Sequence, residues 1–250
     1  MSTSDDTNPE ALDAFIERWR EAQAVEIANA QTFVIELCEL LGVPRPDPAT
    51  KDPARDGYVF ERPVAFQDGA SASGGRIDLY KRGCFVLETK QGVDAENAAR
   101  AAGKGKSRSA GHGTRGTAAW DRTMAAAKRQ AERYARNLDV PATHGAVAHT
   151  EPVPPLVVAC DVGYCLDLYA NFGHPQRYVP FPDAASYRVT LGDLRRTEAR
   201  ERLRLAFTDP EVLDPSRRQA AATRELAATL ARLAASLEAA GHGADAVFGF

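Results

Sequence analysis

Three residues suited to metal-assisted phosphate chemistry lie in one short segment of the sequence, namely Asp78, Glu88 and Lys90. Two apolar runs, residues 77–80 and 84–87, flank a turn-like segment that ends in Gly83, and this pattern predicts a β-hairpin. Asp78 lies inside the first predicted strand, where an unpaired carboxylate is unusual. Glu88 and Lys90 are two residues apart, so strand alternation places them on one face. The hairpin therefore predicts two acids and a lysine that converge.

This combination suits a divalent cation beside a reacting phosphate. Mg²⁺ prefers carboxylate and carbonyl oxygens, and Asp78, Glu88 and the backbone carbonyl of Thr89 are candidate ligands. A bound metal activates water and polarises a phosphoryl oxygen, and Lys90 would orient or deprotonate that water or balance the developing charge. The same spacing also occurs by chance, and a hairpin can carry a surface Glu/Lys pair that has no function.

A second pair of polar residues lies on a predicted helix, over residues 117–137. Gln130 and Tyr134 are four residues apart and therefore share one helix face. Gln130 is a candidate to hydrogen-bond the lysine or a phosphate, and Tyr134 is a candidate to hold a neighbouring group. The alternative is an ordinary amphipathic helix with Tyr134 half-buried and Gln130 solvated.

The remaining pattern predicts an α/β fold. Helices are expected from Pro9, over 22–41 and over 117–137, and strands over 58–66, 77–80, 84–87, 155–160 and 164–169. Residues 68–74, rich in Gly and Ser, are expected to form a turn, and residues 91–117 a long loop. The order of helix, three strands, helix and two strands predicts a mixed sheet flanked by helices. A further helix is expected from Pro215 to Ala240.

Composition restricts the class of partner. The chain has 250 residues, 44% of them hydrophobic, which allows one large domain or one domain with a small appendage. The net charge of -3 excludes a nucleic-acid footprint over the whole surface, so DNA binding would need local basic patches. The loop supplies one candidate patch, which either contacts phosphates or is plain disorder. Its cations are Arg100, Lys104, Lys106, Arg108 and Arg115.

Cysteine spacing and hydropathy exclude two further classes. Cys38, Cys84, Cys160 and Cys165 form no Cys-x-x-Cys pair, so we expect small buried side chains and no zinc site. No apolar run approaches the roughly 18 residues that a membrane span needs, and we expect a cytoplasmic protein with no membrane partner.

The order Asp78, Glu88-x-Lys90 and Gln130-x3-Tyr134 within an α-β-β-β-α-β succession resembles the PD-(D/E)xK nuclease superfamily, in its RecB-like branch with a Q-x3-Y helix. Several separate segments also resemble the N-terminal region of MmeI-like type IIL restriction–modification enzymes. These segments are residues 30–46, 58–62, 75–82, 85–91 and 119–122.

The resemblance implies a restriction-endonuclease-like core over residues 1–207, followed by the beginning of a truncated helical spacer at 208–250. It implies a Mg²⁺-dependent endodeoxyribonuclease of a type II restriction–modification system that acts on double-stranded DNA. Asp78 and Glu88 would bind the metal, Lys90 would be the catalytic lysine, and Gln130 and Tyr134 would support it. Glu36 is a further candidate acid that would reach the metal, and it reads equally well as a solvated helix residue.

The sequence departs from the full-length family in one respect. It contains no Gly-rich cofactor loop after a strand and no Asn-Pro-Pro-Tyr motif, which by resemblance carry S-adenosylmethionine binding and adenine methylation. We therefore expect a split-gene product, a truncated gene or a fragment, with a separate methyltransferase and target-recognition subunit as a candidate partner. Two rival hypotheses remain: a catalytically idle DNA-binding or assembly module, and an RNA-directed nuclease.

Overall fold

The computed structural model describes residues 7–22, 26–68, 71–94, 113–138, 152–174 and 177–240. The chain forms two compact units, Met1–Pro210 and Glu211–Phe250. The sequence places the domain boundary at 207/208, and the role of the second unit as a spacer stays a prediction.

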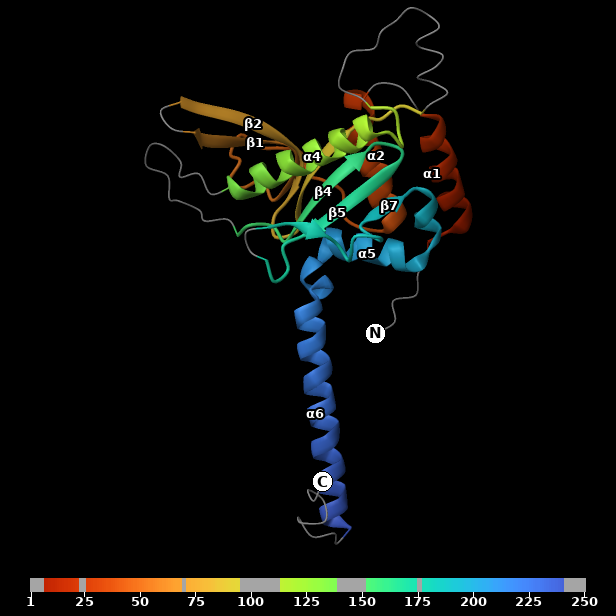
Figure 1. Ribbon diagram of the computed structural model, residues 1–250, viewed down its shortest axis with the longest axis vertical. Coiled ribbons are helices and arrows are strands. Elements are labelled where there is room, and N and C mark those ends of the chain that lie inside the picture. Colours follow the sequence, from red (N-terminus) through yellow and green to blue (C-terminus); the bar gives the residue numbers. More distant parts are fainter. Residues whose placement is uncertain are drawn as a thin grey trace, which may run out of the picture. The chain divides into compact units, whose positions relative to one another are not determined.

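The first unit is a sheet with helices on both faces (Figure 1). Its helices are α1 (Pro9–Glu21), α2 (Glu26–Leu41), α4 (Ala118–Arg136) and α5 (Thr197–Thr208), with a short 3₁₀ helix η1 (Gly192–Arg195). Its strands are β1 (Tyr58–Asp68), β2 (Ser71–Lys81), β3 (Phe85–Lys90), β4 (Leu156–Asp161), β5 (Cys165–Ala170), β6 (Val179–Pro180) and β7 (Arg188–Thr190).

The sheet has seven strands in the order β1-β2-β3-β4-β5-β6, and β7 also pairs with β5. Only β3 and β4 pair in parallel, and the other neighbours are antiparallel. The predicted mixed α/β sheet and the succession α-β-β-β-α-β, which runs here from α2 to β4, are confirmed. This architecture is consistent with a restriction-endonuclease-like core.

Helix α4 covers one face of the sheet. Its buried side chains pack against inward-facing residues of the central strands, and this cluster includes Trp120, Met124, Ala127, Ala131, Tyr80, Val86, Val157 and Ala159. On the opposite face, Phe85 of β3 contacts Phe207 of α5 with ring centroids 4.8 Å apart. Strand β4 is buried along its whole length, as its apolar run predicts. All four cysteines are buried free thiols, so the predicted burial of these side chains is confirmed.

The predicted turn over residues 68–74 is largely wrong. Strand β2 already begins at Ser71 and pairs with β1 in a long antiparallel ribbon, in which Gly74 lies opposite Ala65 and Gly75 opposite Val64. Small polar residues favour turns locally, but here the cross-strand register holds them extended. Pro63 lies in β1, at the edge of the sheet, where its missing N–H is tolerated.

The 3₁₀ turn η2 (Pro210–Leu213) contains the boundary between the two units, and the second unit contains α6 (Pro215–Ala239), close to the predicted helix. Leu226, Leu230 and Leu233 are exposed along this helix. Within the part of the chain that the structure describes, no helix is both long enough and apolar enough to cross a bilayer.

Candidate active site

The sequence-predicted acids meet where β2 and β3 separate. Pairing between these strands ends at Leu79 and Leu87, and one further step in the same register sets Asp78 opposite Glu88. Beyond this point β2 continues along β1 and β3 continues along β4. The Asp78 carboxylate links β2 to β3 at the point where they separate. Its Oδ2 accepts hydrogen bonds from the Thr89 amide N–H at 2.7 Å and from the Thr89 hydroxyl at 2.6 Å.

Glu88 is the unusual group of this site. The residue is fully buried, at 0% exposure, and neither carboxylate oxygen accepts a hydrogen bond from any described residue. Burial, and then the charge of Asp78, raise the pKa of Glu88 to about 8, against the opposing effect of Lys90. A buried carboxylate that accepts no hydrogen bond carries a large desolvation cost. A cation bound beside Glu88 would offset this cost.

Lys90 supplies the nearest positive charge. Its Nζ lies 3.7 Å from Oε2 of Glu88, beyond hydrogen-bonding distance but close enough for an ion pair. The predicted common face of Glu88 and Lys90 is thus observed. The Lys90 carbonyl accepts the Val162 N–H at 2.9 Å, which fixes the end of β3 against the end of β4. The ammonium group lies at the rim of the site, with 23% of its side chain exposed.

Helix α4 carries Gln130 to the same place. Gln130 Nε2 donates to the Tyr134 hydroxyl at 3.1 Å, so the i, i+4 spacing produces the contact that it predicts. The Tyr134 ring stacks on Phe66 of β1, with centroids 5.6 Å apart and planes at 8°. Burial raises the pKa of Tyr134. Tyr134 thus supports Gln130 from the side of the β1–β2 ribbon.

Gly75 makes room for Tyr134. A Cβ at Gly75 would lie 2.7 Å from the Tyr134 hydroxyl and ring, closer than any normal contact, whereas a Cβ at Gly74 would meet only the Val64 carbonyl at 3.4 Å. We expect Gly75→Ala to lower the free energy of unfolding by about 1–3 kcal/mol through overpacking. Chemical denaturation of this variant and of the matched control Gly74→Ala would test this. Equal losses in the two variants would contradict the assigned role of Gly75.

One cavity joins these residues. Its lining comes from α2, the first three strands and α4, and comprises Ala30, Gln31, Val34, Phe60, Glu61, Asp78, Leu79, Glu88, Thr89, Lys90 and Gln130. The structure therefore brings together five of the predicted site residues, with Tyr134 behind Gln130. Their catalytic and metal-binding roles stay predictions.

Glu36 is not brought to this cavity. Its two carboxylate oxygens are held elsewhere, by Trp19 Nε1 at 2.8 Å and by the Arg18 guanidinium at 2.9 Å. The reason is helical rotation, since Glu36 lies five residues after Gln31 and therefore points about 140° away from it. The proposed reach of Glu36 to the metal has no support in this arrangement.

Two polar residues that line the cavity, Gln31 and Glu61, were not predicted as site residues from the sequence. Glu61 continues the β1–β2 register opposite Asp78 and has a positive φ of 54°, rare for a residue other than glycine. Burial, and then the charge of Asp78, raise the pKa of Glu61. Its place depends on a cross-strand register that no local pattern encodes.

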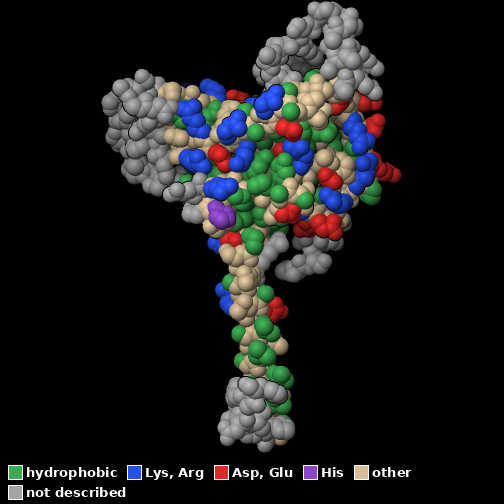
Figure 2. Space-filling view, in the orientation of Figure 1, with side chains coloured by type: hydrophobic (Ala, Val, Ile, Leu, Met, Phe, Trp, Pro, Cys, Tyr) green, Lys and Arg blue, Asp and Glu red, His purple; other side chains and the backbone are tan. Residues whose placement is uncertain are grey.

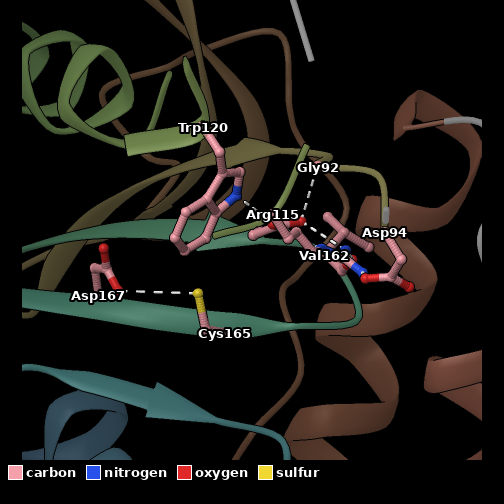
Figure 3. Close-up of polar contacts among 8 residues, drawn as sticks. Gly92, Asp94, Arg115, Trp120, Val162, Cys165 and Asp167 are labelled. Atoms are coloured by element: carbon pink, nitrogen blue, oxygen red, sulfur yellow. Dashed lines mark hydrogen bonds and ion pairs between the residues drawn. The ribbon is translucent and has the colours of Figure 1, made fainter. Parts of the chain in front are cut away.

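A second polar cluster lies at the end of β4 (Figure 3). Asp161 is fully buried and accepts hydrogen bonds from the Gly92 amide at 2.9 Å, Trp120 Nε1 at 2.7 Å and the Arg115 guanidinium at 2.8 and 3.0 Å. Arg115 therefore does not serve the predicted phosphate patch, since its side chain is 9% exposed and pairs with carboxylates. The other four cations of that patch lie outside the described residues.

The cavity offers a hard cation two carboxylates, those of Asp78 and Glu88. Among the described residues, no group of three His, Cys, Asp or Glu side chains is arranged to hold a metal ion. Asp78 and Glu88 nevertheless form a pair of carboxylates on one cavity wall, and neither oxygen of Glu88 accepts a hydrogen bond from any described residue. Mg²⁺ commonly uses one or two carboxylates and keeps several waters, so these residues fit it.

Comparison with known protein families gives one match. The family model described as MmeI, N-terminal domain, matches residues 7–240. The chain belongs to the MmeI N-terminal domain family. The match spans both the cavity-bearing unit and α6, and membership indicates a region of a restriction–modification enzyme. No curated protein and no solved structure matched the chain.

Proposed function

We propose that this MmeI-type region hydrolyses DNA phosphodiesters in a Mg²⁺-dependent reaction, as a PD-(D/E)xK-type endonuclease. The observation that carries the proposal is the Glu88 carboxylate, which is fully buried, lacks a hydrogen-bond donor among the described residues, and shares a cavity with Asp78 and Lys90. A merely structural pair would have its buried oxygens satisfied. Membership in a restriction–modification family supports DNA as the substrate.

Asp78 and Glu88 would hold the cation, with the Thr89 carbonyl as the further candidate ligand. When bound, Mg²⁺ would neutralise the two carboxylates and polarise a phosphoryl oxygen. The Asp78 carboxylate is already fixed by the Thr89 amide and hydroxyl, so it needs little reorganisation to present its other oxygen. Such preorganised groups cost little rearrangement at the moment of reaction.

Lys90 and Gln130 would act on the phosphate and on the attacking water. The Lys90 ammonium lies at the rim of the cavity, where it can balance the charge that develops on the phosphoryl oxygens. Gln130 enters from α4, and its contact with Tyr134 restricts the directions that its amide can take. Its amide can donate to a phosphate oxygen or accept from water.

Cleavage of supercoiled plasmid by the purified chain would test the proposal. We expect nicked and linear products with Mg²⁺, none with a chelator, and a rate at least about 10²-fold lower for Lys90→Ala, since one electrostatic group is lost. The matched control is Lys51→Ala, an exposed lysine on the loop before β1, which should cut at the wild-type rate.

Cleavage by Lys90→Ala at the wild-type rate would contradict the assignment. A wild-type chain that binds DNA and never cuts it under these conditions would favour the catalytically idle module instead.

A further inference from the structure

The solvent-facing crest of α4 carries four arginines: Arg122, Arg129, Arg133 and Arg136. All four are exposed. At 3.6 residues per turn their side chains fall within an arc of about 60°, and the row extends for about 21 Å along the helix. Figure 2 shows lysine and arginine side chains gathered over α4 on the viewed face. We call these four residues the arginine crest.

Helix stability and packing do not explain Arg122 and Arg129, whereas the Arg133 guanidinium lies 3.9 Å from the centre of the Phe66 ring. Arg129 and Arg133 are like charges at i, i+4, an arrangement that costs a few tenths of a kcal/mol. Arg133 and Arg136 lie in the last turn of α4, where the helix macrodipole favours cations, whereas Arg122 and Arg129 lie outside that turn. Among the described residues, neither Arg122 nor Arg129 has an ion-pair partner.

The acidic residues of α4 lie outside the arginine crest. Asp121 and Glu132 lie on one flank of the helix, and Glu132 pairs with Lys128 at 3.0 Å. Gln130 lies on the other flank, and it lines the candidate active site. The crest therefore runs beside the cavity, with Arg129 and Arg133 at positions i−1 and i+3 from Gln130. A chain of net charge -3 has concentrated positive charge along this one line.

We propose that the arginine crest binds the phosphate backbone of duplex DNA and sets the direction in which the duplex passes the cavity. The inference rests on the proposed nuclease function for the choice of DNA as partner. Arginine guanidinium groups suit phosphate because they form paired, charge-assisted hydrogen bonds. Contacts of this kind position a duplex and carry no sequence information. The crest thus supplies placement and leaves target recognition to other groups.

Salt dependence of binding separates this role from a structural one. A labelled DNA duplex would be titrated with the full chain between 50 and 200 mM KCl, without divalent cations, so that no cleavage occurs. Each phosphate contact contributes about 0.9 to the slope of log Kd against log salt. We expect Arg122→Gln with Arg129→Gln to reduce the slope by about 2 and to weaken binding at least about tenfold.

Two further variants complete the test. Arg122→Lys with Arg129→Lys keeps the charge and should retain the wild-type slope to within about 0.5. Lys51→Gln with Arg55→Gln removes two exposed cations from the loop before β1 and should also behave as wild type. A wild-type slope in the glutamine variant of the crest, or no binding of duplex DNA by the wild-type chain, would overturn the inference. If the chain cleaves plasmid but its DNA binding does not depend on the arginine crest, the proposed nuclease function stands and the proposed DNA-binding surface is rejected.

Discussion

Glu88→Gln is expected to stabilise the metal-free protein at pH 8 and to abolish its Mg²⁺-dependent cleavage. The folded protein holds Glu88 with a pKa of about 8, against an ordinary value of 4.5. Between these values the folded state keeps a proton that the unfolded chain releases, so rising pH favours unfolding. The wild-type free energy of unfolding should fall by up to about 1.4 kcal/mol per pH unit over this interval. Glutamine has no proton to lose and should remove this dependence.

Urea denaturation at several pH values in the presence of a chelator would measure the difference between Glu88→Gln and wild type. The difference should be small near pH 5 and should grow towards pH 8. Addition of Mg²⁺ at ten times its Kd should restore about 1.4 kcal/mol to the wild type by mass action, and nothing to the variant. Cleavage by the variant should fall by at least about 10²-fold.

The exposed Glu17 of α1 provides the matched control for Glu88→Gln. Its side chain is exposed to water, and a surface substitution of this kind usually changes the free energy of unfolding by no more than about 0.5 kcal/mol. A Glu88→Gln variant whose difference in stability from wild type is independent of pH would contradict the account of Glu88 as a buried carboxylate without a hydrogen-bond donor.

The core of the candidate site was predictable because it depends on local geometry. The turn at Gly83 and the two-residue period of β3 fix where Asp78, Glu88 and Lys90 lie, and these rules need no knowledge of distant contacts. The same holds for Gln130 and Tyr134, whose four-residue spacing sets their contact. The mixed sheet followed from the order of the elements.

The remaining features depend on long-range pairing. Glu61 reaches the cavity because β1 pairs with β2 in one register, and Glu36 misses it because of how α2 is rotated against the sheet. The expected turn over residues 68–74 failed for the same reason, since pairing with β1 overrides local turn preference. Asp161 gave no sequence signal either, because its three partners come from separate segments.

Asp161→Ala is expected to cause the largest loss of stability, about 3–5 kcal/mol, which corresponds to a fall in Tm of about 10 °C. The substitution leaves the Arg115 guanidinium, Trp120 Nε1 and the Gly92 amide without their common acceptor in a buried site. Buried donors without an acceptor carry the full cost of desolvation, and the Arg115 guanidinium would keep its contacts with Asp94 and the Val162 carbonyl. Thermal unfolding followed by circular dichroism would measure the loss.

An exposed pair of the same residue types is the control for Asp161→Ala. Arg195 and Asp13 form an ion pair at 2.6 Å, but their side chains are 47% and 64% exposed. Water and salt screen such a pair, so Asp13→Ala should change stability by no more than about 1 kcal/mol. Asp161 also lies in register with Lys90 and fixes the Gly92 amide two residues beyond it. Equal effects of the two substitutions would show that the buried cluster does not hold this end of β3.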